Sequence, residues 1–468
     1  MGRSAAPVAW LIACIALLLW PALLNGYPLV FADSGTYLSQ AIRHYLGWDR
    51  PAVYSVFLLI THWKLTNWSS VVVQAMMVLY GLDLLRRSFT PDVPRWLLLP
   101  MIAAFCLVTP LPWFVGQLMP DLFTSLLTLV IAVLVLRPES VSRVEIIGLA
   151  LFAAWMTASH LSNVWIATGL AIILVPVRHL LLRGERLGWH GVRRVAAPIA
   201  LAVFVLCTIN LAAFRRFTIS PFGNVFLLAR LIYDGPGELT LQQDCPASGW
   251  RLCAYTDALP PHPTRFPNSD YFLWQPHGPL AQLGGAKRLS TEAGQIILRT
   301  IREHPLAVTE SGTYNFLRQL LRFKTGDGLH AWRGEVRPII ASSFPARELR
   351  AFDLSLQSRG KVRVPAWLQW LHDAGFWAGL AATLYCFVVA LRERQPLALL
   401  CAAVLLCLLG NAAVTGMLSG PHDRYQSRVI WLVWVTPMLL VCRAWATQPE
   451  SAKVAPLAIP EVSGPIAE

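Results

Sequence analysis

The residues of this sequence that could do chemistry are a few acids, bases and arginines that lie between apolar segments. Asp33 directly follows the first apolar stretch, and Asp121 follows Pro120 at the start of another. His160 lies in a short polar turn between two more. A carboxylate or an imidazole at such a position is available as a general base. Each also has an ordinary structural interpretation, as a helix cap, a first-turn acid or a turn residue.

A second group of polar residues lies in the last short loop, which contains His422, Asp423, Arg424, Tyr425 and Arg428. Arginine binds carboxylate and phosphate oxygens through a planar fork of donors, so this loop favours an anion such as a lipid phosphate. The alternative is that both arginines only extend from the interface toward water. We assign the three acid–base candidates to catalysis and His422, Arg424, Tyr425 and Arg428 to substrate binding.

The composition defines the setting in which these residues act. The chain has 468 residues, of which 55% are hydrophobic and only 14% are charged. Soluble domains carry about 25% charged residues, so a water-soluble globular protein is excluded, and so is a disordered chain, which would be poor in apolar residues. The net charge of +13 does not indicate a nucleic-acid partner, because the basic residues follow a membrane pattern. The expected partner is a lipid bilayer.

Apolar runs predict an all-α polytopic membrane protein with about ten spans. They lie at about 8–24, 66–85, 95–114, 118–136, 144–161, 163–182, 195–214, 373–391, 396–416 and 428–446. The short loops on one side carry fifteen Lys and Arg residues and those on the other side five. The positive-inside rule therefore predicts cytoplasmic termini and a multi-pass protein of the inner (plasma) membrane. A signal peptide cleaved after Ala32 is the alternative for the start, but the apolar stretch is longer than the usual one of about 7–15 residues.

This topology leaves three features outside the cytoplasm. The first loop, 25–65, is too long for a bare connector. We expect a short amphipathic helix at 34–46, capped by Asp33 and Ser34, and an interfacial helix at 50–63. The second feature is a large region at 215–372, between the helices of 1–214 and those of 373–446. The third is the loop 417–427. The tail, 447–468, is expected to be disordered.

The exported region contains Cys245 and Cys253, whereas the seven other cysteines lie in or beside apolar spans. A cysteine pair in an exported region predicts a disulfide in an oxidising compartment. Metal binding is the weaker alternative, because the spacing is not one that zinc sites use. The sequence also contains no Walker loop, dinucleotide glycine motif, His-Glu-x-x-His or Gly-x-Ser-x-Gly motif. An ATP-driven pump, a zinc protease of that type and an α/β hydrolase are therefore disfavoured.

The arrangement resembles the GT-C superfamily of membrane glycosyltransferases, and within it the protein mannosyltransferases. The resemblance is carried by an acidic residue after the first span (Asp33), the run Arg50-Pro51-Ala52-Val53-Tyr54, Asp121, His160 with Asn163, and Arg424-Tyr425. It covers about 1–215 and 415–446. It implies that Tyr37, Arg50 and Tyr54 of the first loop also contact substrate.

The resemblance further implies transfer of a sugar from a polyprenyl-phosphate carrier to an unidentified acceptor, with Asp33 as the general base. Many members carry an acidic pair where this chain has Asp33-Ser34, so a divalent metal cofactor is left open. The alternative functions are a transporter or flippase for a lipid-linked or anionic substrate, and a non-catalytic assembly partner. Paired halves and mid-membrane ionisable residues, which are typical of transporters, are not evident in the sequence.

Overall fold

The computed structural model describes residues 2–181, 189–260 and 268–448. The described residues form helices joined by loops, with no strand among them beyond one isolated bridge. Seven helices are long and apolar enough to cross a membrane, which suggests a membrane protein. They are Ala6–Asn25, Trp68–Phe89, Leu161–Leu180, Gly191–Phe214, Ala366–Arg392, Leu397–Leu418 and Asp423–Ala446. The predicted disorder of the tail falls almost wholly on 449–468, outside the described residues.

These seven segments correspond to α1 with α2 (Gly2–Leu18, Trp20–Asn25), α5 (Trp68–Phe89), α10 (Leu161–Leu181), α11 (Trp189–Phe214), α20 (Ala366–Arg392), α21 (Leu397–Leu418) and α22 to α23 (Asp423–Ile430, Trp431–Trp434, Val435–Ala446). The three other predicted spans coincide with shorter helices. These are α6 (Leu98–Val108, after Arg95–Leu97), α8 (Leu122–Leu136) and α9 (Arg143–Ser159), of 11, 15 and 17 residues. The all-helical class is thus confirmed, and the count of ten stays a prediction.

Helix α8 forms the centre of the bundle. All 15 of its residues are buried, and 11 of them are Leu, Val, Ile or Ala, as expected for a helix that is surrounded by other helices. Its neighbours are α5, α9, α10, α11, α21 and α22. Pro138–Ser140 follows it as a single helical turn, and α7 (Leu111–Val115) precedes it. Asp121, the residue before α8, is therefore held at the end of a fully buried helix.

The first long loop contains two short helices, α3 (Ala32–Arg43) and α4 (Val53–His62). The helix expected at 34–46 begins two residues earlier than predicted, so Asp33 lies in its first turn and Phe31 is the N-cap. The predicted cap at Asp33 was wrong. The capping bond is made by Ser34, whose hydroxyl accepts from the backbone N–H of Phe31 at 2.9 Å. Helix α4 is apolar on both faces, with Tyr54 buried and Ile60 exposed.

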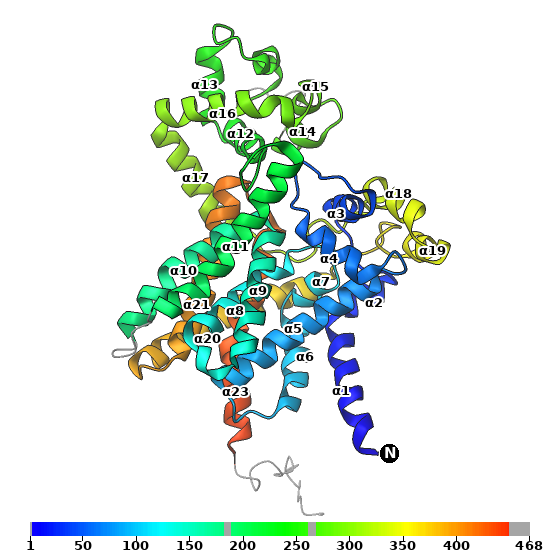
Figure 1. Cartoon of the computed structure of the whole chain (residues 1–468), viewed down its shortest axis with the longest axis vertical. Helices are drawn as coiled ribbons and strands as arrows, with labels where there is room; N and C mark the ends of the chain where they lie inside the picture. Colours follow the sequence, from blue (N-terminus) through cyan, green and yellow to red (C-terminus); the bar gives the residue numbers. More distant parts are fainter. Residues whose placement is uncertain (1, 182–188, 261–267, 449–468) are drawn as a thin grey trace, which may run out of the picture.

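The predicted exported region contains α12 (Gly223–Tyr233), α13 (Pro236–Asp244), Arg251–Ala258, α14 (Ser269–Trp274), α15 (Pro279–Gln282), α16 (Ala286–Glu303), α17 (Pro305–Leu320), α18 (Arg333–Ser343) and α19 (Ala346–Leu354). Figure 1 shows α12 to α16 at the end of the molecule opposite the N-terminus. They enclose an apolar core of their own, which includes Phe222, Leu252, Phe272 and Ile296. The predicted disulfide is confirmed, with the Cα atoms of Cys245 and Cys253 5.5 Å apart.

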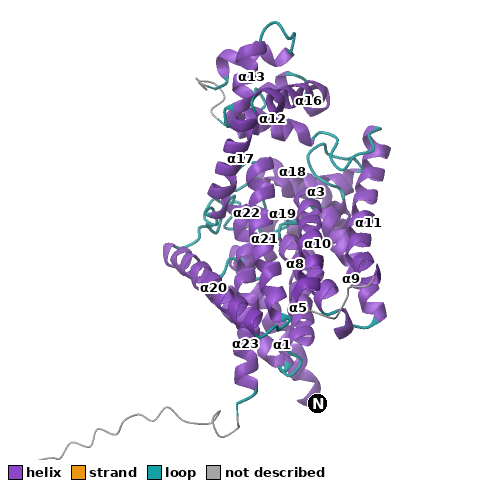
Figure 2. Ribbon diagram, turned by 90° about the vertical axis from the view of Figure 1, so that its left-hand side faces the viewer, coloured by secondary structure: helices purple, strands orange, loops and turns teal. Residues whose placement is uncertain are grey.

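Helix α18, near the end of this region, packs against α3 (Figure 2). The helices approach closely at Gly35, where a Cβ atom would overlap the carbonyl oxygen of Glu335. Glycine is therefore required for this contact. The packing brings a segment from the last third of the chain over the helix that carries Asp33.

Candidate functional site

The backbone before Asp33 is held beside the backbone before Asp121. The N–H of Leu29 donates to the carbonyl oxygen of Gly116 at 2.8 Å, and the N–H of Leu118 donates to that of Leu29 at 2.9 Å. The Ser34 hydroxyl adds a bond to the carbonyl oxygen of Leu118 at 2.9 Å. These bonds fix the start of α3 against the start of α8, so the two candidate carboxylates belong to one site.

A second set of bonds ties the same segment to the predicted exported region. The Gln357 amide pairs with the backbone of Val30, accepting from its N–H at 2.9 Å and donating to its carbonyl at 2.7 Å. The N–H of Gln357 donates to Asn25 Oδ1 at 2.7 Å. All three residues are buried. We call this arrangement the Asn25–Gln357 clamp; it holds the chain between the first span and α3 in one conformation.

Asp33 lies between two arginines. Arg50 Nη2 is 2.9 Å from one carboxylate oxygen, and Arg424 Nη2 is 3.6 Å from the other. Burial by itself raises the pKa of the Asp33 carboxyl, but the charges of Arg50 and then Arg424 outweigh it and hold the pKa below its ordinary value. Asp33 is therefore a carboxylate anion with both oxygens engaged.

The Arg424 guanidinium is held by aromatic rings. Its central carbon lies 3.9 Å from the centre of the Phe31 ring and 5.1 Å from that of Tyr425, which are cation–π distances. Its backbone N–H donates to Asp327 Oδ2 at 3.0 Å. Its Nη1 atom is buried and has no hydrogen-bond partner. Arg424 is thus fixed in position with one donor left unused.

Asp121 and Arg428 form a second ion pair, with Nη1 to Oδ1 at 3.0 Å and both side chains fully buried. Arg428 Nη2 also donates to Asn411 Oδ1 at 2.8 Å and to the Ser162 hydroxyl at 3.0 Å. Since its donors are engaged inside the protein, Arg428 is placed to orient Asp121. The other carboxylate oxygen of Asp121, Oδ2, has no partner.

His160 joins this network through Ser162. The Ser162 hydroxyl lies 2.7 Å from His160 Nδ1, and the Ser162 N–H donates to the same atom at 3.3 Å. Because Arg428 donates to the Ser162 oxygen, the hydroxyl proton is free to point at Nδ1. Nδ1 is then the acceptor, and the ring proton is on Nε2.

Tyr37 and Tyr54, both predicted to contact substrate, differ in the hydrogen-bond partners of their hydroxyls. Tyr54 donates to Gln74 Oε1 at 2.8 Å, and the Gln74 amide in turn donates to the carbonyl oxygens of Val115 and Gln117. The Tyr37 hydroxyl is buried without a partner. Their rings pack edge to face, with centroids 5.0 Å apart. Tyr54 is thus linked through Gln74 to the backbone that precedes Asp121, whereas the Tyr37 hydroxyl has no hydrogen-bond partner.

The remaining predicted residues lie at the edge of the cluster. The His422 ring packs against Tyr425, with centroids 5.3 Å apart, and its backbone pairs with the Gln319 side chain. Burial lowers the pKa of His422. Neither His422 nor Tyr425 forms a bond to Asp33 or Asp121 within the described ranges.

Sequence reasoning missed several residues that shape the site: Phe31, Ser162, Asp327, Asn411 and Gln357. Asn411 had a detectable signal, since it is an amide inside an otherwise apolar span. Asp327 and Gln357 had none, because they are ordinary polar residues of a long region and only the fold brings them to the site. The sequence contains nothing that marks Phe31 as a partner of an arginine.

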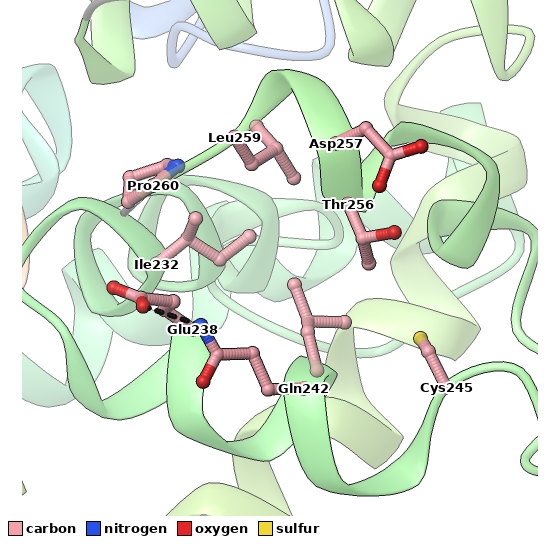
Figure 3. Close-up of a pocket in the computed structure, with 9 residues that line it drawn as sticks. Ile232, Glu238, Gln242, Cys245, Thr256, Asp257, Leu259 and Pro260 are labelled. Carbon is pink, nitrogen blue, oxygen red and sulfur yellow. Dashed lines mark hydrogen bonds between the residues drawn. The ribbon is translucent and has the colours of Figure 1, made fainter. Parts of the chain in front are cut away.

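A separate cavity of about 330 Å³ lies among α12, α13 and Arg251–Ala258 (Figure 3). Glu238, Gln242, Thr256 and Asp257 give it a polar rim, and Ile232, Leu241 and Leu259 an apolar wall. It includes none of the residues predicted for the site.

No cluster of three or more His, Cys, Asp or Glu side chains suited to a metal ion occurs among the residues that the structure describes. Comparison with protein-family models, curated proteins and solved structures finds no match. The function must therefore be argued from the site itself: two carboxylates and three arginines, brought together from three distant parts of the chain.

Proposed function

We propose that the protein is an integral membrane glycosyltransferase that moves a sugar from a polyprenyl-phosphate-linked donor to an acceptor on the exported face of the inner membrane. In this proposal the chain has ten spans, both termini are cytoplasmic, and the Asp33 cluster faces outward. The observation that carries it is the placement of Asp33 between Arg50 and Arg424, beside a second buried carboxylate.

Arg50 and Arg424 are the proposed ligands of the donor phosphate. Both already hold an anion, the Asp33 carboxylate, and Arg424 retains an unused donor. A phosphate carries more charge and more acceptor oxygens than a carboxylate, so it competes for both arginines. Arg428, whose donors are occupied, is assigned to holding Asp121 and not to binding phosphate.

Transfer then proceeds by displacement at the anomeric carbon. Phosphate binding releases Asp33 from its arginines, and the freed carboxylate takes the proton of the acceptor hydroxyl. The acceptor oxygen forms the new bond to the anomeric carbon while the bond to the phosphate oxygen breaks. The departing phosphate keeps the electron pair, and the guanidinium groups of Arg50 and Arg424 stabilise its charge.

The side chains present do not favour a divalent cation here. Asp33 and Asp121 are each paired with arginine, and the described residues supply no third acidic or imidazole ligand. Arginines in the same place provide the positive charge that a phosphate leaving group needs. We therefore assign that role to Arg50 and Arg424.

The test is mass spectrometry of cell-envelope glycolipids and glycans from cells with and without the gene. A species that differs by the mass of one sugar is expected, and it should vanish in cells that carry Asp33→Asn. The matched control is Asp353→Asn, because Asp353 is ion-paired with Arg337 but lies outside the site; it should retain the species. If wild-type and deletion cells give identical spectra, or Asp33→Asn retains full transfer, the proposal is wrong. A flippase would relocate a lipid without this change in mass.

A further inference from the structure

Three buried polar atoms of the cluster have no hydrogen-bond partner: the Tyr37 hydroxyl, Arg424 Nη1 and Asp121 Oδ2. The exposed fractions of these side chains are small, with Tyr37 at 0%, Asp121 at 1% and Arg424 at 9%. Buried polar atoms in native proteins are nearly always paired with protein, ordered water or a ligand. Three such atoms in one cluster therefore require a common explanation.

The three atoms come from elements that are locked together. Tyr37 lies one helical turn after Asp33 on the same face of α3, and Arg424 lies one turn before Arg428 on α22. Arg424 bonds Asp33 and Arg428 bonds Asp121, so both helices are anchored at the site. The side chains are near enough to interact electrostatically, Arg424 with Asp121 and Tyr37 with both carboxylates. Yet no hydrogen bond or ion pair joins the three atoms to one another in the described part of the chain.

The chemistry of the atoms defines what fits them. Arg424 Nη1 can only donate, Oδ2 of the ionised Asp121 carboxylate can only accept, and the Tyr37 hydroxyl can do either. An anion without a hydroxyl satisfies the first and the third but is repelled by Asp121. A neutral sugar alone satisfies Asp121 but offers Arg424 Nη1 no anionic oxygen. A group that carries a hydroxyl next to an anionic oxygen satisfies all three.

We propose that the Tyr37 hydroxyl, Arg424 Nη1 and Asp121 Oδ2 form a subsite for a glycosyl phosphate. The phosphate accepts from Arg424 and Tyr37, and a ring hydroxyl of the sugar donates to Asp121. This inference rests on the proposed function and deepens it, because it gives Asp121 and Tyr37 the recognition of the sugar together with its phosphate. It predicts that the protein prefers a hexose 1-phosphate to inorganic phosphate.

The two tyrosines provide a matched experiment. Tyr37→Phe removes a hydroxyl that has no partner, so the thermal unfolding temperature of the full-length protein in detergent should be unchanged or raised. Tyr54→Phe removes an equally buried hydroxyl that bonds Gln74, so it should lower that temperature. Titration calorimetry with glucose, mannose and galactose 1-phosphates, and with inorganic phosphate, then measures binding without any turnover.

For the tightest-binding hexose 1-phosphate, Tyr37→Phe should raise Kd about tenfold, as expected for the loss of one hydrogen bond to a charged group. Tyr80→Phe, which removes a hydroxyl that bonds Glu145 outside the cluster, should leave that Kd unchanged. Asp121→Asn should abolish the preference for the hexose phosphate over inorganic phosphate. Because Asp121→Asn can also disturb the pair with Arg428, the tyrosine variants decide the question.

An unchanged Kd in Tyr37→Phe overturns the inference, because the free atoms would then be satisfied by water alone. Wild-type protein that binds no hexose 1-phosphate, or that binds it no better than phosphate, overturns it as well. These results are separable from failure of the proposed function. A one-sugar mass difference together with unaltered Kd in Tyr37→Phe would reject the subsite alone. Discriminating binding without any mass difference would reject the transfer reaction alone.

Discussion

Arg428 and Asp121 form an ion pair at 3.0 Å in which neither side chain reaches solvent. The guanidinium also bonds Asn411 of α21 and Ser162 of α10, so one side chain joins four elements of the bundle. A buried pair of this kind adds little net stability relative to apolar residues, but breaking it leaves an uncompensated buried charge. Its role in the site is to fix the direction of the Asp121 carboxylate.

Arg428→Met should therefore destabilise the protein by about 3–5 kcal/mol, because it leaves Asp121 charged and unpaired in the interior. The double variant Arg428→Met with Asp121→Leu removes both charges and should recover much of that loss. The double variant should still lack activity. Chemical denaturation in detergent measures the stability of both proteins, and a double variant no more stable than the single one would contradict this account.

The pH dependence of stability should reveal the environment of Asp33. Its pKa in the folded protein is held below the ordinary value, against the effect of burial, by Arg50 and then Arg424. A depressed pKa contributes stability above the pKa of the unfolded chain, and that contribution is lost as pH falls through the folded value. Wild type should therefore be more stable than Asp33→Asn at neutral pH, and the difference should shrink only below the ordinary pKa of an aspartate. Thermal unfolding of both proteins across the acidic range is the measurement. If the stability difference between wild type and Asp33→Asn does not change with pH, the assignment of a depressed pKa to Asp33 is wrong.

Gly328→Ala should disturb Arg424 without changing any charge. Gly328 has a φ of +78°, and a Cβ atom there would overlap the Phe31 ring. Displacing that ring removes the surface on which the Arg424 guanidinium lies. The strain of the left-handed backbone alone is about 1–2 kcal/mol, so both stability and transfer should fall. The control is Gly334→Ala in α18, where a Cβ atom meets nothing within 4 Å and the helix should gain slightly in stability. Equal behaviour of the two variants would count against a role for Phe31.

The proposed topology can be tested with single cysteines at exposed positions. Thr291 lies on α16 and Thr447 follows α23, at opposite ends of the molecule (Figure 1). In a background without the seven free cysteines, Thr291→Cys should react with a membrane-impermeant reagent in intact cells. Thr447→Cys should react only after the membrane is opened. The reverse pattern would place the Asp33 cluster on the cytoplasmic side.

The helical class, the disulfide and the short helices of the first loop could be predicted because each depends on a local pattern. Apolar runs, a lone cysteine pair and a period of about 3.6 residues are all visible within short windows of sequence. The proximity of Asp33 to Asp121 could be inferred only from topology, since both were expected on one side of the bilayer. The sequence did not predict which arginine pairs with each carboxylate. Arg428, expected to hold phosphate, is engaged with Asp121 and Asn411 instead.

The parts that could not be predicted depend on contacts across long stretches of chain. Gln357 hydrogen-bonds Val30, which is 327 positions away in sequence, and Asp327 hydrogen-bonds Arg424, which is 97 positions away. Neither pair has a local signature, because a glutamine or an aspartate in a long loop is compatible with many positions. Whether Tyr37 or Tyr54 keeps a free hydroxyl likewise depends on where Gln74 lies, and no spacing rule links Gln74 to Tyr54.

The Asn25–Gln357 clamp has a consequence for the order in which the protein becomes active. Asp33 leaves the ribosome early, whereas Gln357 and Arg424 are synthesised only after most of the chain. Until then the segment before Asp33 lacks the bonds that hold it, and the carboxylate lacks one of its arginines. A chain arrested before its last helix therefore carries the acidic residue without its cationic partner. Under the proposed function, the site is therefore complete only at the end of translation, and an incompletely inserted molecule should not catalyse transfer.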